Sequence, residues 1–269
     1  MQSHPAGEIV HRRYHPSSDL AVYVEHFWSV HWDLGLNASQ RVETLPHPSV
    51  HLVFEREATA LEGVRKGAFA RMLQGKGFVF AVKFRPASFY GFYGKPLTTL
   101  SNKSVYPAEV FGADFPALEA SVLRAQSPTK MMSCTEDYFR ARLPAKDENV
   151  NFLNQLLSRI ASDRSITRVA HLLPIAGGTV RRLQRLFNQY VGVGPKWAIT
   201  RYRIHEALER VHENKVKDWV SLALDLGYAD QAHFIRDFKA LVGTTPLLYQ
   251  TRALSGKSAR SVGKVSGTD

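Results

Sequence analysis

The sequence contains a single cysteine, Cys134, among its 269 residues. One thiol excludes a disulfide within the chain and any zinc site built from several cysteines, and it is consistent with a reducing compartment. Long apolar runs are lacking too. No stretch approaches the roughly 18 apolar residues of a membrane span, and residues 1–8 lack the apolar segment of a secretory signal. We therefore expect a cytoplasmic, nucleoid-associated protein without a membrane partner.

The usual signatures of catalysis are also missing. The sequence has no glycine-rich phosphate loop, no paired carboxylates in a recognisable motif, and no nucleophile with a base at familiar spacing. We expect no enzyme activity, no cofactor and no metal centre.

Acidic residues are scarce in the carboxyl-terminal part of the chain. The formal net charge is +11, and residues 164–264 hold 17 Lys or Arg against 7 Asp or Glu. Basic charge alone fits either nucleic acid or an anionic membrane surface. Its concentration in residues 164–264 favours a nucleic-acid partner for that part.

Residues 165–190 have the pattern of a helix-turn-helix unit. A short helix is expected over residues 166–173, Gly177 and Gly178 supply a tight connection, and Thr179 is suited to cap the next helix. In that second helix Val180, Leu183, Leu186, Phe187 and Tyr190 recur at helical spacing. The opposite face carries no acid and consists of Arg181, Arg182, Gln184, Arg185, Asn188 and Gln189, side chains that hydrogen-bond base edges or phosphates.

The same pattern recurs in residues 218–241. Asp218 and Asp230 can each cap a short amphipathic helix, and Gly227 separates the two. Between the units, Pro195 suits the first turn of a longer helix that can hold them at a fixed separation. In the last helix the outward positions are Gln231, Ala232, His233 and Arg236, and the buried ones are Phe234, Phe238 and Leu241.

An ordered series of motifs closely resembles the AraC/XylS family of bacterial transcription regulators. The motifs are Leu183-Gln-Arg-Leu-Phe187, Gly192-Val-Gly-Pro195, Leu226-Gly-Tyr228, Gln231-Ala-His-Phe234 with Arg236 and Phe238, and Gly243-Thr-Thr-Pro246. The resemblance implies a seven-helix domain that lays two recognition helices into successive major grooves of double-stranded DNA.

The resemblance also implies which side chains read bases. The family's reading positions match Arg181, Gln184 and Arg185 in the first unit and Gln231, Ala232 and Arg236 in the second. Thr179, Arg182 and His233 flank them as further DNA-binding candidates. Two alternatives, phosphate contact and a solvated charge, stay open for Lys196, Arg201, Arg203 and Lys239.

The chain departs from the family at two positions. Pro174 falls inside the first helix of the first unit, where it should end or bend that helix early. Gly178 stands where the family usually has an apolar residue. Both departures put the rigidity of the first unit in doubt.

The pattern of residues 6–93 favours strands, chiefly over residues 22–32, 50–54 and 78–84, with glycine and proline turns between them. We expect an antiparallel β-barrel or sandwich, in which residues 20–24 alternatively form a helical turn. The segments Leu45-Pro-His-Pro-Ser-Val-His-Leu-Val-Phe54 and Val82-Lys-Phe-Arg-Pro86 resemble a β-type module of unknown function that is attached to some AraC-type regulators.

Within this module we expect an effector pocket. His47 and His51 are spaced to lie on one side of a strand, with His26 and His31 on a neighbouring strand, but no acid at a recognisable spacing completes a metal site. Lys83 and Arg85 are the cations that an anionic effector could use. The aromatic residues between Phe78 and Tyr93 are expected mostly in the core, with a pocket lining as the alternative.

Residues 107–160 read as four helical segments that either pack on the β-domain or form dimer contacts. The expected division is a β-rich effector domain over residues 1–105, a helical extension and linker over 106–162, a DNA-binding domain over 163–252 and a disordered basic tail over 253–269. The fold class is therefore α+β with two domains.

The sequence predicts a ligand-responsive, sequence-specific DNA-binding transcription regulator. Contact with RNA polymerase and homodimerisation are left open. Two alternatives remain: an architectural DNA-binding protein, with a small ratio of specific to nonspecific affinity, and a cupin-like enzyme with metal at His47 and His51.

Overall fold

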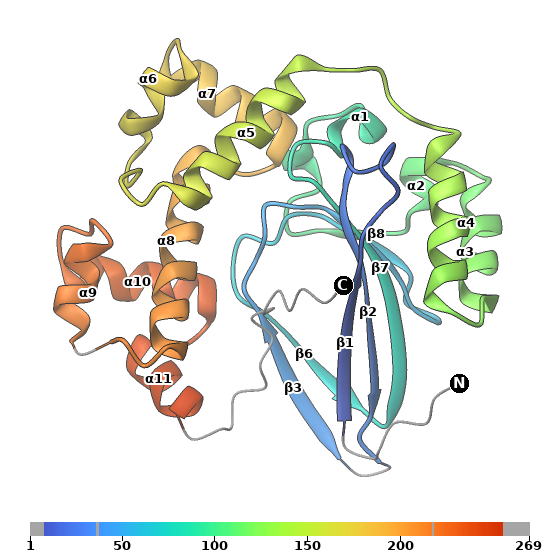
Figure 1. Ribbon diagram of the computed structural model, residues 1–269, viewed down its shortest axis with the longest axis horizontal. Helices are drawn as coiled ribbons and strands as arrows, with labels where there is room; N and C mark the ends of the chain where they lie inside the picture. Colours follow the sequence, from blue (N-terminus) through green and yellow to red (C-terminus); the bar gives the residue numbers. More distant parts are fainter. Residues whose placement is uncertain (1–7, 36–37, 217, 255–269) are drawn as a thin grey trace.

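The computed structural model describes residues 8–35, 38–216 and 218–254. A β-rich amino-terminal part and an all-helical carboxyl-terminal part lie beside each other (Figure 1). The strands are β1 (Glu8–Tyr14), β2 (Val24–Asp33), β3 (Ser39–Thr44), β4 (His51–Phe54), β5 (Ala60–Glu62), β6 (Phe69–Gln74), β7 (Lys76–Phe84) and β8 (Ser104–Val105). This arrangement confirms the predicted α+β class with a helical carboxyl-terminal domain.

The strands form an open sheet and a separate hairpin. The larger sheet has the order β1-β2-β7-β4-β5-β8, and β3 pairs only with β6 among the described strands. Each of the pairings is antiparallel. In the strand order β1 and β8 stand at opposite edges, so the sheet is open and is not the barrel that was one of the two predicted alternatives, whereas the antiparallel β-rich character is confirmed.

The central strand β7 is buried from Val79 to Phe84, which explains its nearly continuous apolar run. Phe80, Val82 and Phe84 point into one core, because alternate residues of a strand share a face. Val79 points to the other face, where it packs with residues of the β3–β6 hairpin. Lys83 shares that second face and lies directly across from His26 on β2 and His51 on β4.

Small helices cover the first face of the sheet. They are α1 (Tyr90–Tyr93), the 3₁₀ turn η1 (Leu97–Thr99), α2 (Ala108–Phe111), α3 (Phe115–Arg124) and α4 (Pro128–Arg140). Their aromatic side chains, including Phe89, Phe115 and Phe139, join the strand residues in one core. The expectation that most aromatic residues of this region pack in the core is therefore met.

The helical part contains both expected units. Its elements are α5 (Glu148–Ser162), the 3₁₀ turn η2 (Val169–Leu172), α6 (Leu173–Ala176), α7 (Val180–Leu186), the π-helical turn η3 (Phe187–Val191), α8 (Pro195–His212), α9 (Trp219–Asp225), α10 (Gln231–Val242) and α11 (Pro246–Leu254). Helix α8 runs between the unit formed by α6 and α7 and the unit formed by α9 and α10 (Figure 1).

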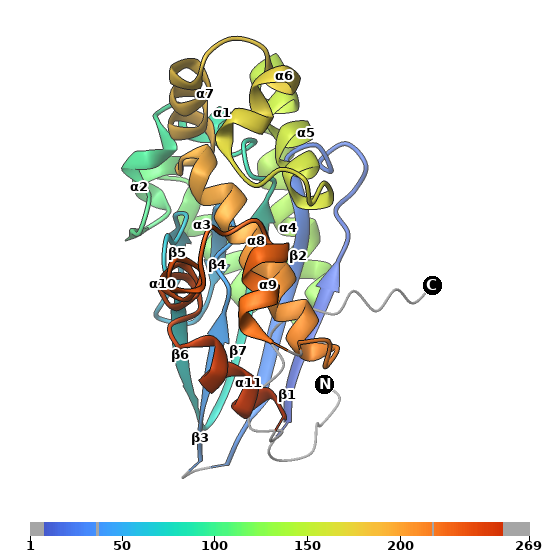
Figure 2. The ribbon, with the colours of Figure 1, turned by 90° about the vertical axis from the view of Figure 1, so that its left-hand side faces the viewer.

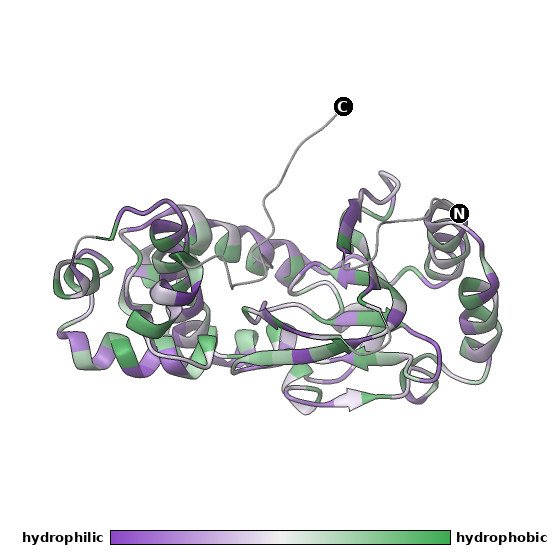
Figure 3. Ribbon diagram, turned by 90° about the horizontal axis from the view of Figure 1, so that it is seen from below, coloured by the Kyte–Doolittle hydropathy of each residue, from purple (hydrophilic) through white to green (hydrophobic). Residues whose placement is uncertain are grey.

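Two clusters hold this part together. Leu153, Leu156 and Leu157 of α5 pack with Leu183 and Phe187 of the first unit. A second cluster joins α8 to the second unit through Ile204, Leu208, Leu222, Phe234 and Phe238. Seen from below, hydrophobic and hydrophilic residues alternate along the helices and strands of both parts (Figure 3).

Two expectations from the sequence concern segments at the ends of elements. Residues 18–23 form a turn that leads into β2, which agrees with the alternative of a helical turn over residues 20–24. The predicted tail from residue 253 begins inside α11, and from residue 255 on it lies outside the described residues. Within the described part of the chain, none of the helices is long and apolar enough to cross a lipid bilayer.

Candidate nucleic-acid interface and interdomain cavity

The first recognition helix, α7, begins at the predicted cap. The Thr179 hydroxyl accepts a hydrogen bond from the backbone amide of Arg182 at 3.2 Å, which satisfies one of the free amides of the first turn. Leu183 and Leu186 are buried, whereas the side chains of Arg181, Arg182, Gln184 and Arg185 are exposed. The helix therefore presents a face with three cations and an amide to solvent.

The polar face of α7 is shorter than the sequence pattern indicated. The Gln189 amide donates to the Tyr90 hydroxyl at 2.8 Å, so this side chain is turned towards the β-rich part. The Gln184 amide donates to Asn188 at 3.0 Å. Val180, which was assigned to the apolar face, is 48% exposed. The exposed polar face is thus confined to residues 181–185.

The connection before α7 depends on two glycines. Gly177 and Gly178 have φ angles of +65° and +82°, a region that residues with a Cβ rarely adopt. This conformation explains why glycine replaces the apolar residue of the family at position 178. Pro174 lies in the first turn of α6, and the preceding residues form the 3₁₀ turn η2, so the first helix of this unit is split rather than continuous.

The second recognition helix, α10, also begins at its predicted cap. The Asp230 carboxylate accepts a hydrogen bond from the His233 amide at 2.7 Å. Ala232 and Arg236 are exposed, and Gln231 and His233 are half-buried. His233 Nε2 lies 3.5 Å from a carboxylate oxygen of Asp237. This face therefore carries an acid, unlike the face of α7.

Two of the arginines considered for phosphate contact are used inside the protein. Arg201 is 1% exposed, and its Nε donates to the carbonyl oxygen of Pro46 at 2.9 Å. The Arg203 guanidinium stacks 3.6 Å from the centre of the Tyr228 ring and donates to the carbonyl oxygen of Leu226. Both are thereby removed from the candidate interface, whereas Lys196 and Lys239 remain exposed.

The carboxyl-terminal ends of both recognition helices contact the β-rich part. Beyond α7, the Ser101 hydroxyl donates to the carbonyl oxygen of Gly192 at 2.5 Å, and the rings of Tyr90 and Tyr190 are 4.2 Å apart. In α10, the carbonyl oxygen of Ala240 accepts from the amide of Ala68 at 3.1 Å. In Figure 2 both helices lie on the same side of α8. The amino-terminal turns, which helix-turn-helix proteins use to contact bases, carry the exposed side chains of Arg181, Arg182 and Ala232.

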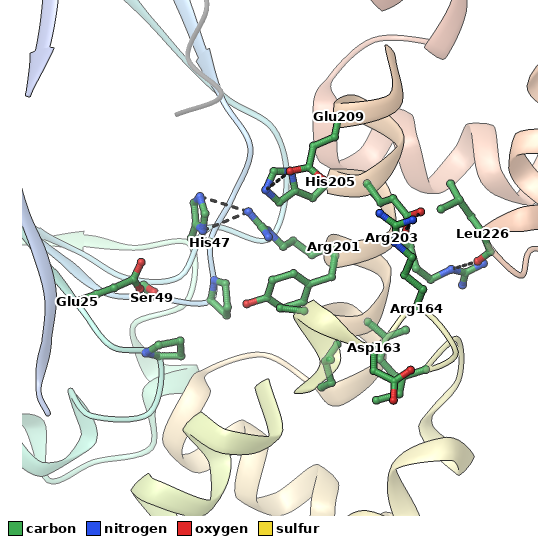
Figure 4. A pocket seen from close by; sticks show the side chains of 18 of the residues that line it. Glu25, His47, Ser49, Asp163, Arg164, Arg201, Arg203, His205, Glu209 and Leu226 are labelled. Atoms are coloured by element: carbon green, nitrogen blue, oxygen red, sulfur yellow. Dashed lines mark hydrogen bonds and ion pairs between the residues drawn. The ribbon is translucent and has the colours of Figure 1, made fainter. Parts of the chain in front are cut away.

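A cavity of about 350 Å³ lies between the β-rich part and α8 (Figure 4). His47 and Lys83, two of the four effector candidates, line it. His51, on β4, is half-buried beside Lys83 of β7, and it accepts a hydrogen bond from the Trp28 indole at 3.3 Å. Arg85 lies outside this cavity, is exposed, and donates to the carbonyl oxygen of Ala21.

The structure corrects the placement of the two histidines. His47 lies in the loop before β4 rather than on the strand with His51. The Arg201 Nη2 atom lies 3.2 Å from Nδ1 and 3.3 Å from Nε2 of this ring. Within the described residues, no group of three or more His, Cys, Asp or Glu side chains is arranged to hold a metal ion.

Burial keeps the histidines of this region neutral. Burial, with smaller contributions from Lys83 and His26, lowers the pKa of His51 to about 3. Burial and then the charge of Lys83 lower the pKa of His26 to about 4, and burial followed by Arg201 holds the pKa of His47 well below its ordinary value. Burial also lowers the pKa of Lys83, although Glu25 opposes this effect with an ion pair of 2.7 Å.

Several residues of the cavity were not among the effector-pocket candidates of the sequence analysis. Arg201 and His205 come from α8 and Ser49 from the loop before β4. For Arg201, the sequence held one signal of burial. The residue lies three positions before the buried Ile204 in α8, on the side of the helix that packs inward. Sequence periodicity does not distinguish an arginine at such a position from one at the edge of the apolar stripe.

Comparison with known proteins gives two family matches. Residues 12–106 match a domain of unknown function (DUF6597), and residues 174–252 match a helix-turn-helix domain. The second match contains nearly all of the motifs from which tandem units were predicted and confirms that prediction. No curated protein matches the chain.

Among solved structures, the chain is similar to ToxT from Vibrio cholerae. The sequence identity is 12%, the match covers 93% of this chain and 98% of that chain, and the TM-score is 0.38. For a structure of wild-type ToxT with a bound unsaturated fatty acid, the identity is 10%, the coverage is 96% of this chain and 100% of that chain, and the TM-score is 0.36.

Proposed function

We propose that this protein is a transcription regulator that reads a specific duplex sequence with both recognition helices. The match of residues 174–252 to a helix-turn-helix domain of the AraC type supports this function. The observation that carries this proposal is that the first turns of α7 and α10 carry exposed side chains, among them Arg181 and Ala232, while the other ends of both helices contact the β-rich part. Base edges are read from the amino-terminal turns of such helices.

The exposed side chains of both recognition helices suit base recognition. Arg181 and Arg185 are exposed on α7, and Arg236 is exposed on α10. Arginine donates two hydrogen bonds to O6 and N7 of guanine, and each such pair discriminates by about 1–3 kcal/mol. Gln184 and Gln231 suit adenine in the same way, whereas Arg182 and His233 suit a phosphate beside the bases.

We propose further that a small molecule bound through the amino-terminal part modulates DNA binding. Both units contact that part at separate places: the first through Tyr90 and Ser101, the second through Ala68. A change in the amino-terminal part can therefore alter how the two recognition helices stand relative to each other. Contact with RNA polymerase and homodimerisation remain predictions.

The packing also supports a revised division of the chain. Helix α5 shares a core with the first unit, whereas α3 and α4 share one with the sheet. We therefore propose that α5 is part of the DNA-binding domain and that the linker is the segment of residues 141–147.

Selection from a random duplex library with the full-length chain tests the proposal. We expect an enriched sequence with two half-sites about one helical turn apart, bound at least a thousandfold more tightly than random duplex at the same salt concentration. An architectural DNA-binding protein would enrich no sequence and give a small ratio. Failure to bind duplex DNA at low salt would contradict both functions.

A further inference from the structure

The cavity between the β-rich part and α8 has a cationic end. Lys83, from β7, is 6% exposed, and Arg201, from α8, is 1% exposed. Placing two cations in a site with little water costs free energy unless anions compensate for it. Figure 4 shows the Arg201 side chain directed from α8 towards His47.

The anionic compensation present in the protein is incomplete. Glu25 pairs with Lys83 at 2.7 Å, but within the described residues no carboxylate lies within 4.0 Å of the Arg201 guanidinium. Arg201 instead uses the Pro46 carbonyl and the neutral His47 ring. Among the described residues, Glu25 is therefore the carboxylate that forms an ion pair with one of the two cations, and Glu209 acts on Arg201 only from beyond ion-pair distance.

Other polar atoms along the same cavity also have no partner. The Ser49 hydroxyl, the His205 Nδ1 and one terminal nitrogen of Arg203 are buried and make no hydrogen bond within the described part of the chain. All three residues line the cavity. Buried polar atoms without partners are uncommon and call for water, an ion or a ligand. They come from both sides of the cavity.

We propose that this cavity binds a small hydrophilic organic acid, whose carboxylate lies between Arg201 and Lys83 and accepts a hydrogen bond from Ser49. A volume of about 350 Å³ is more than ten times the roughly 30 Å³ of a water molecule, so the site has room for more than an inorganic ion. The rest of the lining mixes charged residues, among them Asp163 and Glu206, with apolar ones such as Ile160 and Ile199, which favours an acid with a short carbon chain over one with a long alkyl chain.

Such a ligand would join the two parts of the protein. Lys83 and Ser49 belong to the β-rich part, whereas Arg201 and His205 belong to the helix between the two helix-turn-helix units. The site is therefore positioned to couple occupancy to the placement of the recognition helices. This coupling rests on the proposed function, but the binding of the acid does not.

Titration calorimetry on the full-length chain tests the site, with succinate, citrate, inorganic phosphate and the neutral diamide succinamide as probes at constant ionic strength. We expect saturable binding of succinate or citrate and none of succinamide. Binding of phosphate as tight as that of both carboxylates would overturn the assignment to an organic acid. Absence of binding by both carboxylates would overturn the site.

Three variants make the test specific. Lys83→Met should weaken binding of the carboxylate about tenfold or more, since a charged hydrogen-bond partner is lost. Glu25→Gln removes the competing carboxylate and should tighten binding several-fold, a gain that a folding defect cannot produce. Arg85→Met, two residues along the chain from Lys83 but outside the cavity, should leave binding unchanged.

Equal affinity in the wild type and both Lys83→Met and Glu25→Gln would overturn the inference. Duplex binding is measured on the same preparations by fluorescence anisotropy. A chain that binds duplex DNA but no carboxylate would retain the proposed function and lose this site. A chain that binds the carboxylate but no DNA would retain this site and contradict the proposed function.

Discussion

The backbone amide of Ala68, in the loop before β6, donates a hydrogen bond of 3.1 Å to the carbonyl oxygen of Ala240 in the last turn of α10. The last four carbonyl groups of a helix have no partner within the helix, so this contact from the β-rich part caps α10. A Cβ atom on Gly243, the residue that follows α10, would lie 3.0 Å from the Cβ of Ala68. The second recognition helix is therefore held at its carboxyl-terminal end by the other domain.

Removing this amide should reduce sequence discrimination. Ala68→Pro deletes one hydrogen bond, worth about 0.5–1.5 kcal/mol, and loosens α10 relative to α7. We expect a loss of about 2- to 10-fold in affinity for the selected duplex and no change for random duplex, measured by anisotropy. Ala68→Ser keeps the amide and serves as the control. Equal losses on both duplexes would contradict the role of this contact in discrimination.

Arginines on the two recognition helices should carry separable parts of the discrimination. Arg185→Ala and Arg236→Ala should each lose about 1–3 kcal/mol of preference for the selected duplex over random duplex, because each removes one bidentate contact with a guanine. Arg124→Ala, at the exposed end of α3 on the far side of the sheet, is a charge-matched control. Preference that is unchanged in both variants at fixed salt would refute the assignment.

The sequence predicted the helical part more accurately than the β-rich part, for physical reasons. The caps at Thr179, Asp218 and Asp230 depend on neighbouring residues, so they could be read locally and are present in the structure. Whether a sheet closes into a barrel depends on pairing between strands that are distant in the chain, and a single sequence does not specify this pairing. The sequence consequently left a barrel and a sandwich as alternatives and did not indicate that the larger sheet is open.

The candidate sites show the same limit. Lys83 and His47 were singled out by residue type, but the cavity becomes apparent only when α8 brings Arg201 beside them. Arg85 is a cation like Lys83 and was a candidate for the same reason. It lies outside the cavity because it comes two residues after Lys83, beyond the end of β7. Contacts between the two parts could not be predicted from local patterns.

Stability should fall as the pH decreases from about 6.5. In the unfolded chain a histidine takes up its proton near pH 6.5, whereas in the fold His26 and His51 resist protonation until about pH 4 and about pH 3. Above pH 6.5 both histidines are neutral in the folded and the unfolded chain, and their full contribution to the free energy of unfolding is present. As the pH falls from 6.5 towards the pKa values of the folded protein, each histidine lowers the free energy of unfolding by about 1.4 kcal/mol per pH unit. Urea unfolding at several pH values between 7.5 and 4.5 measures this slope.

A variant identifies the histidine that causes the slope. His51→Gln removes one titrating group while keeping an acceptor for the Trp28 indole. We expect a smaller decrease in the free energy of unfolding between pH 6.5 and pH 4.5 than in the wild type. An identical slope in both proteins would show that His51 does not contribute.

A DNA-binding fragment should require α5. Leu153, Leu156 and Leu157 pack against the first unit, and Asp147 accepts a hydrogen bond from Tyr190 at 2.8 Å. Each leucine contributes about 1.5–3 kcal/mol through burial. We expect a fragment of residues 145–254 to be helical by circular dichroism and to bind duplex DNA. A fragment of residues 163–254 should lose helical signal and affinity, and equal behaviour of the two fragments would contradict the shared core.

The turn before α7 should tolerate only residues that adopt a left-handed backbone conformation. Gly178 has a φ of +82°, and a Cβ there would lie 3.4 Å from the Arg182 side chain, which is ordinary contact, so the cost of substitution is conformational. Gly178→Val should lower the free energy of unfolding by at least 1 kcal/mol, and Gly178→Asn should cost less, because asparagine adopts this region more readily than β-branched residues do. Urea unfolding of both variants measures the difference. Similar losses for valine and asparagine would point to crowding at Arg182 instead of backbone strain.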